Sequence, residues 1–116
     1  MGDSLPKFIL LIPLNYNDGR EVPKEVLANF REKLFALGGG FSIAGTVEGA
    51  YRMADGTKMI DHSLQIWIGL EEEHFAELER AVAELGAELG QESMYLERSG
   101  GTIHFIPPQP PSGGSL

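Results

Sequence analysis

Histidine and cysteine are the side chains that most often bind metals or act as nucleophiles, and this sequence offers few of them. It has no cysteine and three histidines. No two of the histidines have the His-x-His or His-Glu-x-x-His spacing that directs two imidazoles at one metal ion. His62, His74 and His104 also fall in three different predicted elements. We therefore predict no metal site and no bound cofactor.

The sequence also lacks a recognisable catalytic nucleophile. Without cysteine there is no thiolate, and no Gly-x-Ser-x-Gly motif presents a serine at a strand-to-helix turn. Carboxylates are plentiful, but the glutamates between 71 and 88 have the spacing of the solvent-exposed face of one helix. We predict no catalytic residue from these patterns.

The loop PLNYNDGREVP, residues 13 to 23, carries oxygen-bearing side chains but does not match a calcium loop. The EF-hand order needs an oxygen ligand where Gly19 stands, followed by a closing glutamate. A helical pattern and not a strand follows at Pro23, which argues against a hairpin. We predict a β-α connection that turns at Asp18 and Gly19, with Tyr16 exposed at the rim of the sheet.

Hydrophobic periodicity predicts the elements that must position these groups. Apolar residues spaced three or four apart predict two helices, one from Pro23 to the Gly38-Gly39-Gly40 stop and one from Glu71 to Gly90. Apolar runs and alternating patterns predict strands over 7 to 14 (KFILLIPL), 41 to 52, 58 to 70, 91 to 98 and 102 to 106. A tight turn at 54 to 57 joins the second and third strands.

The resulting order, β-α-β-β-α-β followed by a short strand, predicts an α+β fold. Two split β-α-β units with both helices on one sheet face form a ferredoxin-like two-layer sandwich, here with an extra short C-terminal strand. We predict a single domain over 1 to 106, with its first strand at the centre of the sheet and buried on both faces. The Pro-, Gly- and Ser-rich segment 107 to 116 is predicted to be a flexible tail.

The sheet face without helices is where polar and aromatic residues are expected to gather. If Leu64, Ile66 and Ile68 face the helices, strand alternation points Asp61, Gln65 and Trp67 away from them, and it does the same for Tyr95 and Glu97. Glu48 and Arg52 are expected to join this face, and the loop after the first strand to overhang it. The candidate ligand-binding or interface residues are Tyr16, Asn17, Arg20, Arg52, Gln65, Trp67, Tyr95 and Glu97. A bulge at Gly45 or Gly49 would reverse the faces of the second strand.

Charge and hydropathy exclude several classes of partner. The chain has 17 acidic and 9 basic residues and a formal net charge of -8, which repels nucleic acid. No apolar run approaches the roughly 20 residues of a membrane span, and the N-terminus does not resemble a signal peptide. We therefore predict an acidic cytoplasmic protein that binds neither nucleic acid nor membranes.

Three segments together resemble a family of small bacterial ferredoxin-like (split β-α-β) proteins: LLIPLNYNDG (10 to 19), GTVEGAYRMADGTK (45 to 58) and GQESMYLER (90 to 98). The resemblance implies the fold and contributes no activity and no catalytic residue. The predicted architecture is also similar to that of dimeric α+β-barrel proteins, some of which are oxygenases that need little or no cofactor, or small-molecule binders.

Two functions remain open from the sequence. The first is a non-catalytic module, most simply a homodimer, that binds a small molecule or a protein through the helix-free sheet face. The alternative is a small cofactor-light enzyme of the dimeric α+β-barrel type that acts on a small organic substrate. An enclosed pocket lined by the candidate residues would favour the enzyme, and a flat sheet face would favour the interaction module.

Overall fold

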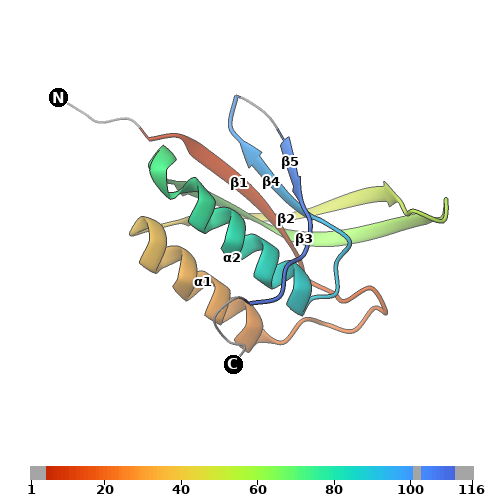
Figure 1. The fold of residues 1–116 in the computed structure, drawn as a ribbon. Coiled ribbons are helices and arrows are strands. Elements are labelled where there is room, and N and C mark those ends of the chain that lie inside the picture. The colour runs from red at the N-terminus through yellow and green to blue at the C-terminus, as the bar shows by residue number, and fades with distance from the viewer. Residues whose placement is uncertain (1–4, 101–102, 112–116) are drawn as a thin grey trace.

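A computed structural model describes residues 5 to 100 and 103 to 111. This part of the chain forms a five-stranded antiparallel sheet in the order β2-β3-β1-β4-β5, with α1 and α2 side by side on one face (Figure 1). The elements are β1 (Lys7–Pro13), α1 (Lys24–Gly38), β2 (Ser42–Arg52), β3 (Lys58–Gly69), a 3-10 turn (Glu72–His74), α2 (Phe75–Glu88), β4 (Met94–Arg98) and β5 (Ile103–Ile106). The predicted α+β ferredoxin-like sandwich with an extra short C-terminal strand is confirmed.

The first strand occupies the centre of the sheet, as its apolar sequence predicts. β1 pairs with β3 along its whole length and with β4 from Phe8 to Leu11. Phe8, Leu10 and Ile12 are fully buried under the helices. Ile9 and Leu11 point to the opposite face and are only half-buried, so β1 is not fully buried on both faces as predicted. We call this opposite side, which neither helix covers, the helix-free face.

The two helices supply the other half of the core. α1 buries Phe30 and Leu34, and α2 buries Leu78, Val82 and Leu85 against the sheet. α1 ends at Gly39, whose φ of 77° is the left-handed conformation that terminates helices. Among the described residues no helix is long and apolar enough to cross a membrane.

A β-bulge reverses the faces of β2 partway along the strand. Ile43 pairs with Ile66, but the next pair is Gly45 with Gln65, so one extra residue lies in β2. Beyond the bulge, Tyr51 pairs with Met59 and points to the helix-free face.

The bulge corrects the expectation for two charged residues of β2. Glu48 pairs with His62 and Arg52 pairs with Lys58, so the backbone register places both on the helix side of the sheet and not on the helix-free face. The prediction failed because one inserted residue shifts every later side chain to the other face.

The segment after β5 begins by lying along α2. The backbone N–H of Gln109 donates to the carbonyl oxygen of Ala83 at 3.0 Å, and Pro108 packs near Gly86. Residues 112 to 116 lie outside the described residues, and the flexibility of the tail stays a prediction.

Gly86 sets how closely α2 approaches β4, and this contact generates a test of the packing. A Cβ atom added at Gly86 would lie 2.7 Å from Cγ of the buried Met94. Alanine has a helix propensity about 1 kcal/mol better than glycine, whereas overpacking costs about 1–3 kcal/mol. We therefore expect Gly86→Ala to lower the free energy of unfolding measured in urea.

A double-mutant cycle supplies the control. In a Met94→Ala background the clashing Cγ is absent, so Gly86→Ala is expected to become neutral or stabilising. An equal loss of stability in both backgrounds would contradict the packing described here.

Candidate functional site

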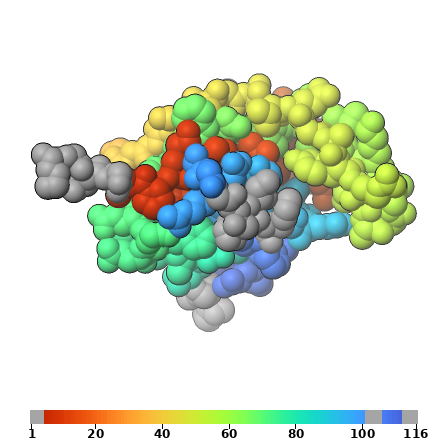
Figure 2. Space-filling model, turned by 90° about the horizontal axis from the view of Figure 1, so that it is seen from above, coloured from red at the N-terminus to blue at the C-terminus, as the bar shows by residue number. Residues whose placement is uncertain are grey.

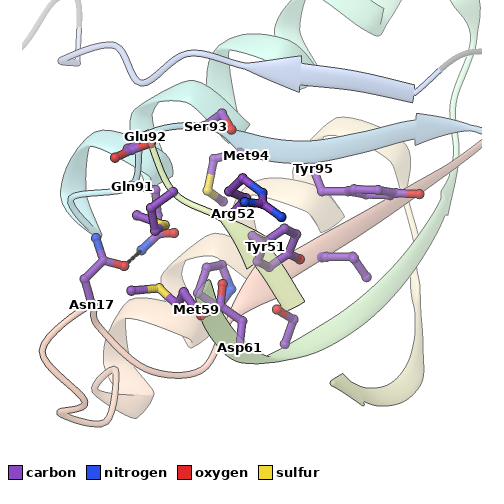
Figure 3. A pocket seen from close by; sticks show the side chains of 14 residues that line it. Asn17, Tyr51, Arg52, Met59, Asp61, Gln91, Glu92, Ser93, Met94 and Tyr95 are labelled. Atoms are coloured by element: carbon purple, nitrogen blue, oxygen red, sulfur yellow. Dashed lines mark hydrogen bonds between the residues drawn. The ribbon is translucent and has the colours of Figure 1, made fainter. Parts of the chain in front are cut away.

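A cavity of about 260 Å³ opens on the helix-free face. It is bordered by the β2–β3 hairpin, which projects past the helices (Figure 1) and lies at one end of the molecule (Figure 2). Leu11 and Pro13 of β1 form its floor. The β2–β3 hairpin supplies one wall, and β4 with the loop before it supplies the other (Figure 3). The uneven length of the strands therefore creates a hollow at this end of the sheet.

The hairpin wall combines an aromatic ring, thioethers and a carboxylate. Tyr51, Met53 and Met59 contribute large side chains, and Asp61 and Ser63 contribute the polar groups. Ser63 is only 4% exposed although it lies on the face that no helix covers. Alternation along β3 brings Met59, Asp61 and Ser63 to the same side, because successive side chains of a strand point to opposite faces.

The side-chain ring of Tyr51 packs directly over Gly49. A Cβ atom added at Gly49 would lie 3.0 Å from the phenolic oxygen of Tyr51 and 3.3 Å from its Cζ. Gly49 is also the cross-strand partner of Asp61. The ring of Tyr51 therefore lies back along β2, next to the carboxylate on β3 (Figure 3).

The opposite wall comes from β4 and the loop that leads into it. Tyr95 lies on the helix-free face and donates its hydroxyl to Glu97 Oε1 at 2.8 Å. This hydrogen bond, together with burial, raises the pKa of the Tyr95 phenol above its usual value. Met94 and the polar side chains of Gln91, Glu92 and Ser93 complete this wall.

Two loops distant in sequence are joined at the rim. The Asn17 side chain donates to the carbonyl oxygen of Gly90 at 3.2 Å and accepts from Gln91 Nε2 at 3.2 Å (Figure 3). The β1–α1 loop is thereby hydrogen-bonded to the α2–β4 loop beside the cavity. This pairing holds the rim in place without any covalent link.

Asp61 carries a partly buried carboxyl group in the cavity. Burial raises the pKa of its carboxyl above the ordinary aspartate value, and the charge of His62 opposes this effect only in part. Burial and the neighbouring Asp61 carboxylate raise the pKa of the Tyr51 phenol as well. Arg52 lines the same cavity, yet within the described residues no ion pair joins it to Asp61. A partly buried carboxylate without a cationic partner is typical of a site that binds a cation or transfers a proton.

The structure brings together three of the residues named from the sequence. Asn17, Arg52 and Tyr95 line the cavity, and Arg52 reaches it from the end of β2 although it lies on the helix side of the strand. Glu97 contacts Tyr95 but is not part of the lining.

Tyr16 and Arg20 lie outside the cavity lining, and Tyr16 is half-buried against the core and not exposed as predicted. Asn15 and Glu21 form an isolated β-bridge, and the backbone N–H of Tyr16 donates to the carbonyl of Arg20 at 2.8 Å. The loop is thus a miniature hairpin, which the helix that follows at Lys24 made unexpected. Arg20 stacks on Tyr16, 4.7 Å from the ring centre, and forms an ion pair with Asp18 at 2.7 Å.

Gln65 and Trp67 occupy another part of the helix-free face, away from the cavity lining. Trp67 is 39% exposed, donates to Gln65 Oε1 at 3.1 Å and lies 3.9 Å from the Lys7 ammonium. Pairing of two copies through this face stays a prediction.

The sequence reasoning left most of the lining out of its candidate set. It placed Asp61 on the correct face but did not select it, because one carboxylate among 17 acidic residues has no distinguishing pattern. The face expected for Glu48 and Arg52 implied the opposite face for Tyr51, because the bulge was not located. The glycine two residues before Tyr51 is the signal that could have found the site, since a glycine inside a strand marks a close approach.

His62 and His74 lie in different elements, β3 and the 3-10 turn before α2. The side chain of His62 is exposed, although it lies on the helix side of β3 with Ile60 and Leu64. His74 Nδ1 lies 2.8 Å from Glu77 Oε1, and this hydrogen bond raises the pKa of the imidazole. Within the described residues no group of three His, Asp or Glu side chains could hold a metal ion; the side chain of His104 lies outside them.

Comparison with known proteins adds a fold-level likeness. No protein-family model and no curated protein matches the sequence. A phage SAM lyase in complex with S-methyl-5′-thioadenosine is similar over 92% of both chains, with 20% sequence identity and a TM-score of 0.65. A phage SAM lyase in the apo state is similar over 94% of both chains, with 20% identity and a TM-score of 0.66. At this identity the likeness shows a shared fold.

The raised pKa of Asp61 generates a prediction about stability. A carboxyl group whose pKa is higher in the folded than in the unfolded chain favours the unfolded chain when it ionises. Its contribution to stability therefore falls as pH rises from the unfolded pKa to the folded pKa. The melting temperature of Asp61→Asn minus that of the unmodified protein should therefore be larger at about pH 7 than at about pH 3.

Asp55 is the control with the opposite sign. Hydrogen bonds from Thr57 lower the pKa of Asp55. The ionised form of Asp55 thus stabilises the fold at neutral pH, and this contribution is lost as pH falls through its folded pKa. Asp55→Asn is expected to lower the melting temperature more at neutral than at acid pH. The same pH trend for both variants would contradict the environment assigned to Asp61.

Proposed function

We propose that this protein is a small enzyme that binds S-adenosylmethionine (SAM) in the cavity on the helix-free face and breaks the bond between its sulfur and its aminocarboxypropyl group. The observation that carries the proposal is the cavity itself, which places the Asp61 carboxylate, without an ion pair among the described residues, beside the ring of Tyr51. The proposal selects the enzyme over the non-catalytic module, because a flat, packed sheet face would have had no such hollow.

The size and lining of the cavity suit a nucleoside bearing a sulfur. Its volume of about 260 Å³ lies just below the roughly 300–1,000 Å³ of small-molecule sites. The ring of Tyr95 offers a stacking surface for a purine, and the methionines offer apolar contact to a thioether. Ser63, Gln91 and Asn17 offer hydroxyl and amide groups for ribose and purine edges.

The reaction balances without a cofactor. The carbon–sulfur bond breaks and sulfur keeps the electron pair, which converts the sulfonium into the neutral thioether of S-methyl-5′-thioadenosine. The carbon released from sulfur accepts an electron pair from the substrate's own carboxylate and closes a five-membered lactone. No oxidant, reductant or water is consumed, and no proton has to move.

The protein's contribution to this reaction is the environment and the geometry. A sulfonium cation and a carboxylate anion both lose charge as the reaction proceeds, so a cavity that excludes water favours the transition state over the solvated reactants. Holding the aminocarboxypropyl chain folded brings the carboxylate oxygen to the reacting carbon, which removes the entropy cost of finding that conformation. Both effects need a shaped hollow with apolar surfaces against the substrate, which Leu11, Pro13 and the methionines of the lining offer.

The likeness to phage SAM lyase supports this choice of substrate. That protein shares the fold over nearly the whole chain, and one of its structures contains S-methyl-5′-thioadenosine. One fold can host many unrelated activities, so the choice of substrate also has to agree with the residues of the site. Here it agrees with the chemistry of the cavity.

The test is to incubate the purified protein with SAM and to follow S-methyl-5′-thioadenosine and homoserine lactone by liquid chromatography. We expect both products to form faster than in buffer alone. Leu11→Trp should abolish turnover and ligand binding because the larger side chain fills the floor of the cavity.

Ile9→Trp is the matched control. Ile9 lies two residues earlier on the same face of β1 and does not line the cavity. Activity should survive this change. If the unmodified protein neither binds SAM in calorimetry nor releases S-methyl-5′-thioadenosine, the proposed function is wrong.

A further inference from the structure

We propose that the Asp61 carboxylate and the ring of Tyr51 form an onium subsite that binds the positively charged sulfur of the substrate and binds the neutral thioether product less tightly. The inference rests on the proposed function and names the part of the cavity that distinguishes substrate from product. It also assigns a role to Gly49, which positions Tyr51 without contacting the ligand.

The geometry of the hairpin places the two groups side by side. Gly49 and Asp61 face each other across β2 and β3, and both they and Tyr51 belong to the helix-free face. The Tyr51 ring folds back over Gly49, with its hydroxyl 3.0 Å from the position of the missing Cβ. The ring therefore extends from the end of β2 toward the Asp61 carboxylate, and both line the cavity.

An aromatic face beside a carboxylate is suited to a soft cation. The negative face of an aromatic ring attracts cations, and sulfonium, whose charge is spread over methyl and methylene groups, gains from such contact. Asp61 supplies the full opposite charge. A partly buried carboxylate without a partner is costly, and a bound cation would remove that cost.

The charged groups around Asp61 leave it available for this role. Arg52 lines the cavity, but no ion pair with Asp61 occurs among the described residues. His62 adjoins Asp61 in β3 but points to the other face of the sheet. Glu92, across the cavity, adds negative charge and not a competing cation.

If Asp61 binds the sulfonium, it should affect KM and kcat differently. The sulfur loses its positive charge as the carbon–sulfur bond breaks, so the attraction to Asp61 is strongest in the ground state and weakens along the reaction. Asp61 should therefore lower the KM for SAM without raising kcat. The same loss of charge weakens the hold on the product and favours its release.

The experiment compares three adenosyl ligands by calorimetry on the unmodified protein and on Asp61→Asn. Sinefungin carries an ammonium where SAM carries the sulfonium and cannot be cleaved, S-adenosylhomocysteine carries a neutral sulfur with the same amino acid group, and S-methyl-5′-thioadenosine lacks that group. We expect Asp61→Asn to lower the affinity for sinefungin about tenfold, as for loss of a charged hydrogen-bond partner. The affinities for the two neutral thioethers should stay nearly unchanged. In turnover assays the KM for SAM should rise and kcat should not fall.

Glu48→Gln is the matched control. It removes one negative charge from the neighbouring strand, on the opposite face of the sheet. It should leave the affinities for all three ligands unchanged, which separates a local contact from the effect of net charge.

The outcomes distinguish this inference from the proposed function. If Asp61→Asn lowers the affinities for sinefungin and S-adenosylhomocysteine equally, Asp61 lies at the amino acid group of the ligand and the proposed subsite is wrong. A fall in kcat at unchanged KM would also overturn it, because Asp61 would then act on the transition state. If the unmodified protein binds none of the three ligands and does not cleave SAM, the proposed function fails and the subsite with it.

A second pair of variants tests the positioning role of Gly49. Gly49→Ala adds a methyl group against Tyr51 and should weaken sinefungin several-fold by displacing the ring, whereas Gly40→Ala, where no atom lies within 4 Å of the added carbon, should not. In a Tyr51→Ala background Gly49→Ala should have no further effect, because the ring through which it acts is absent. Additive losses in the double variant would show that Gly49 does not act through Tyr51.

Discussion

Two helices can cover only one face of this sheet, and most features of the molecule depend on that constraint. β1 pairs with β3 along its whole length and with β4 from Phe8 to Leu11, so most of its backbone is hydrogen-bonded within the sheet. Its side chains alternate, which sends Phe8, Leu10 and Ile12 into the helix-packed core and leaves Ile9 and Leu11 on the other side. The helix-free face is therefore partly apolar at its centre, and the strands that extend past β1 decide what covers it.

The β2–β3 hairpin converts this open face into a hollow. It runs past the end of β1 and presents large side chains of both strands toward the unpaired space beyond Pro13. The bulge between Ile43 and Gly45 decides which β2 side chains take part, because it turns Tyr51 toward the cavity and Glu48 away from it. Gly49 then lets the Tyr51 ring lie flat along the strand. One extra residue and one missing Cβ thus determine the shape of this wall.

The polar groups of the cavity are held by contacts that differ in strength. The rim is fixed by the amide hydrogen bonds between Asn17, Gly90 and Gln91, and Tyr95 is fixed by Glu97. In the part of the chain that the structure describes, no ion pair supports Asp61, and its burial disfavours the ionised state. Groups kept in an unfavourable state in the free protein are typical of binding and catalytic sites, where a ligand relieves the cost.

The sequence by itself determined the element order, the central position of β1, the two amphipathic helices and the short last strand. These features follow from local periodicity, which the chain carries within each segment of roughly ten residues. It also placed Asp61, Tyr95 and Trp67 on the helix-free face, because alternation along an unbulged strand is reliable. The position of the β2 bulge, the miniature hairpin between Asn15 and Glu21, and the gathering of Asn17, Tyr51, Asp61 and Tyr95 around one cavity were decided only by the tertiary structure. Each of these depends on pairing between segments far apart in the chain or on a register set by cross-strand contacts, and no local pattern encodes such a register.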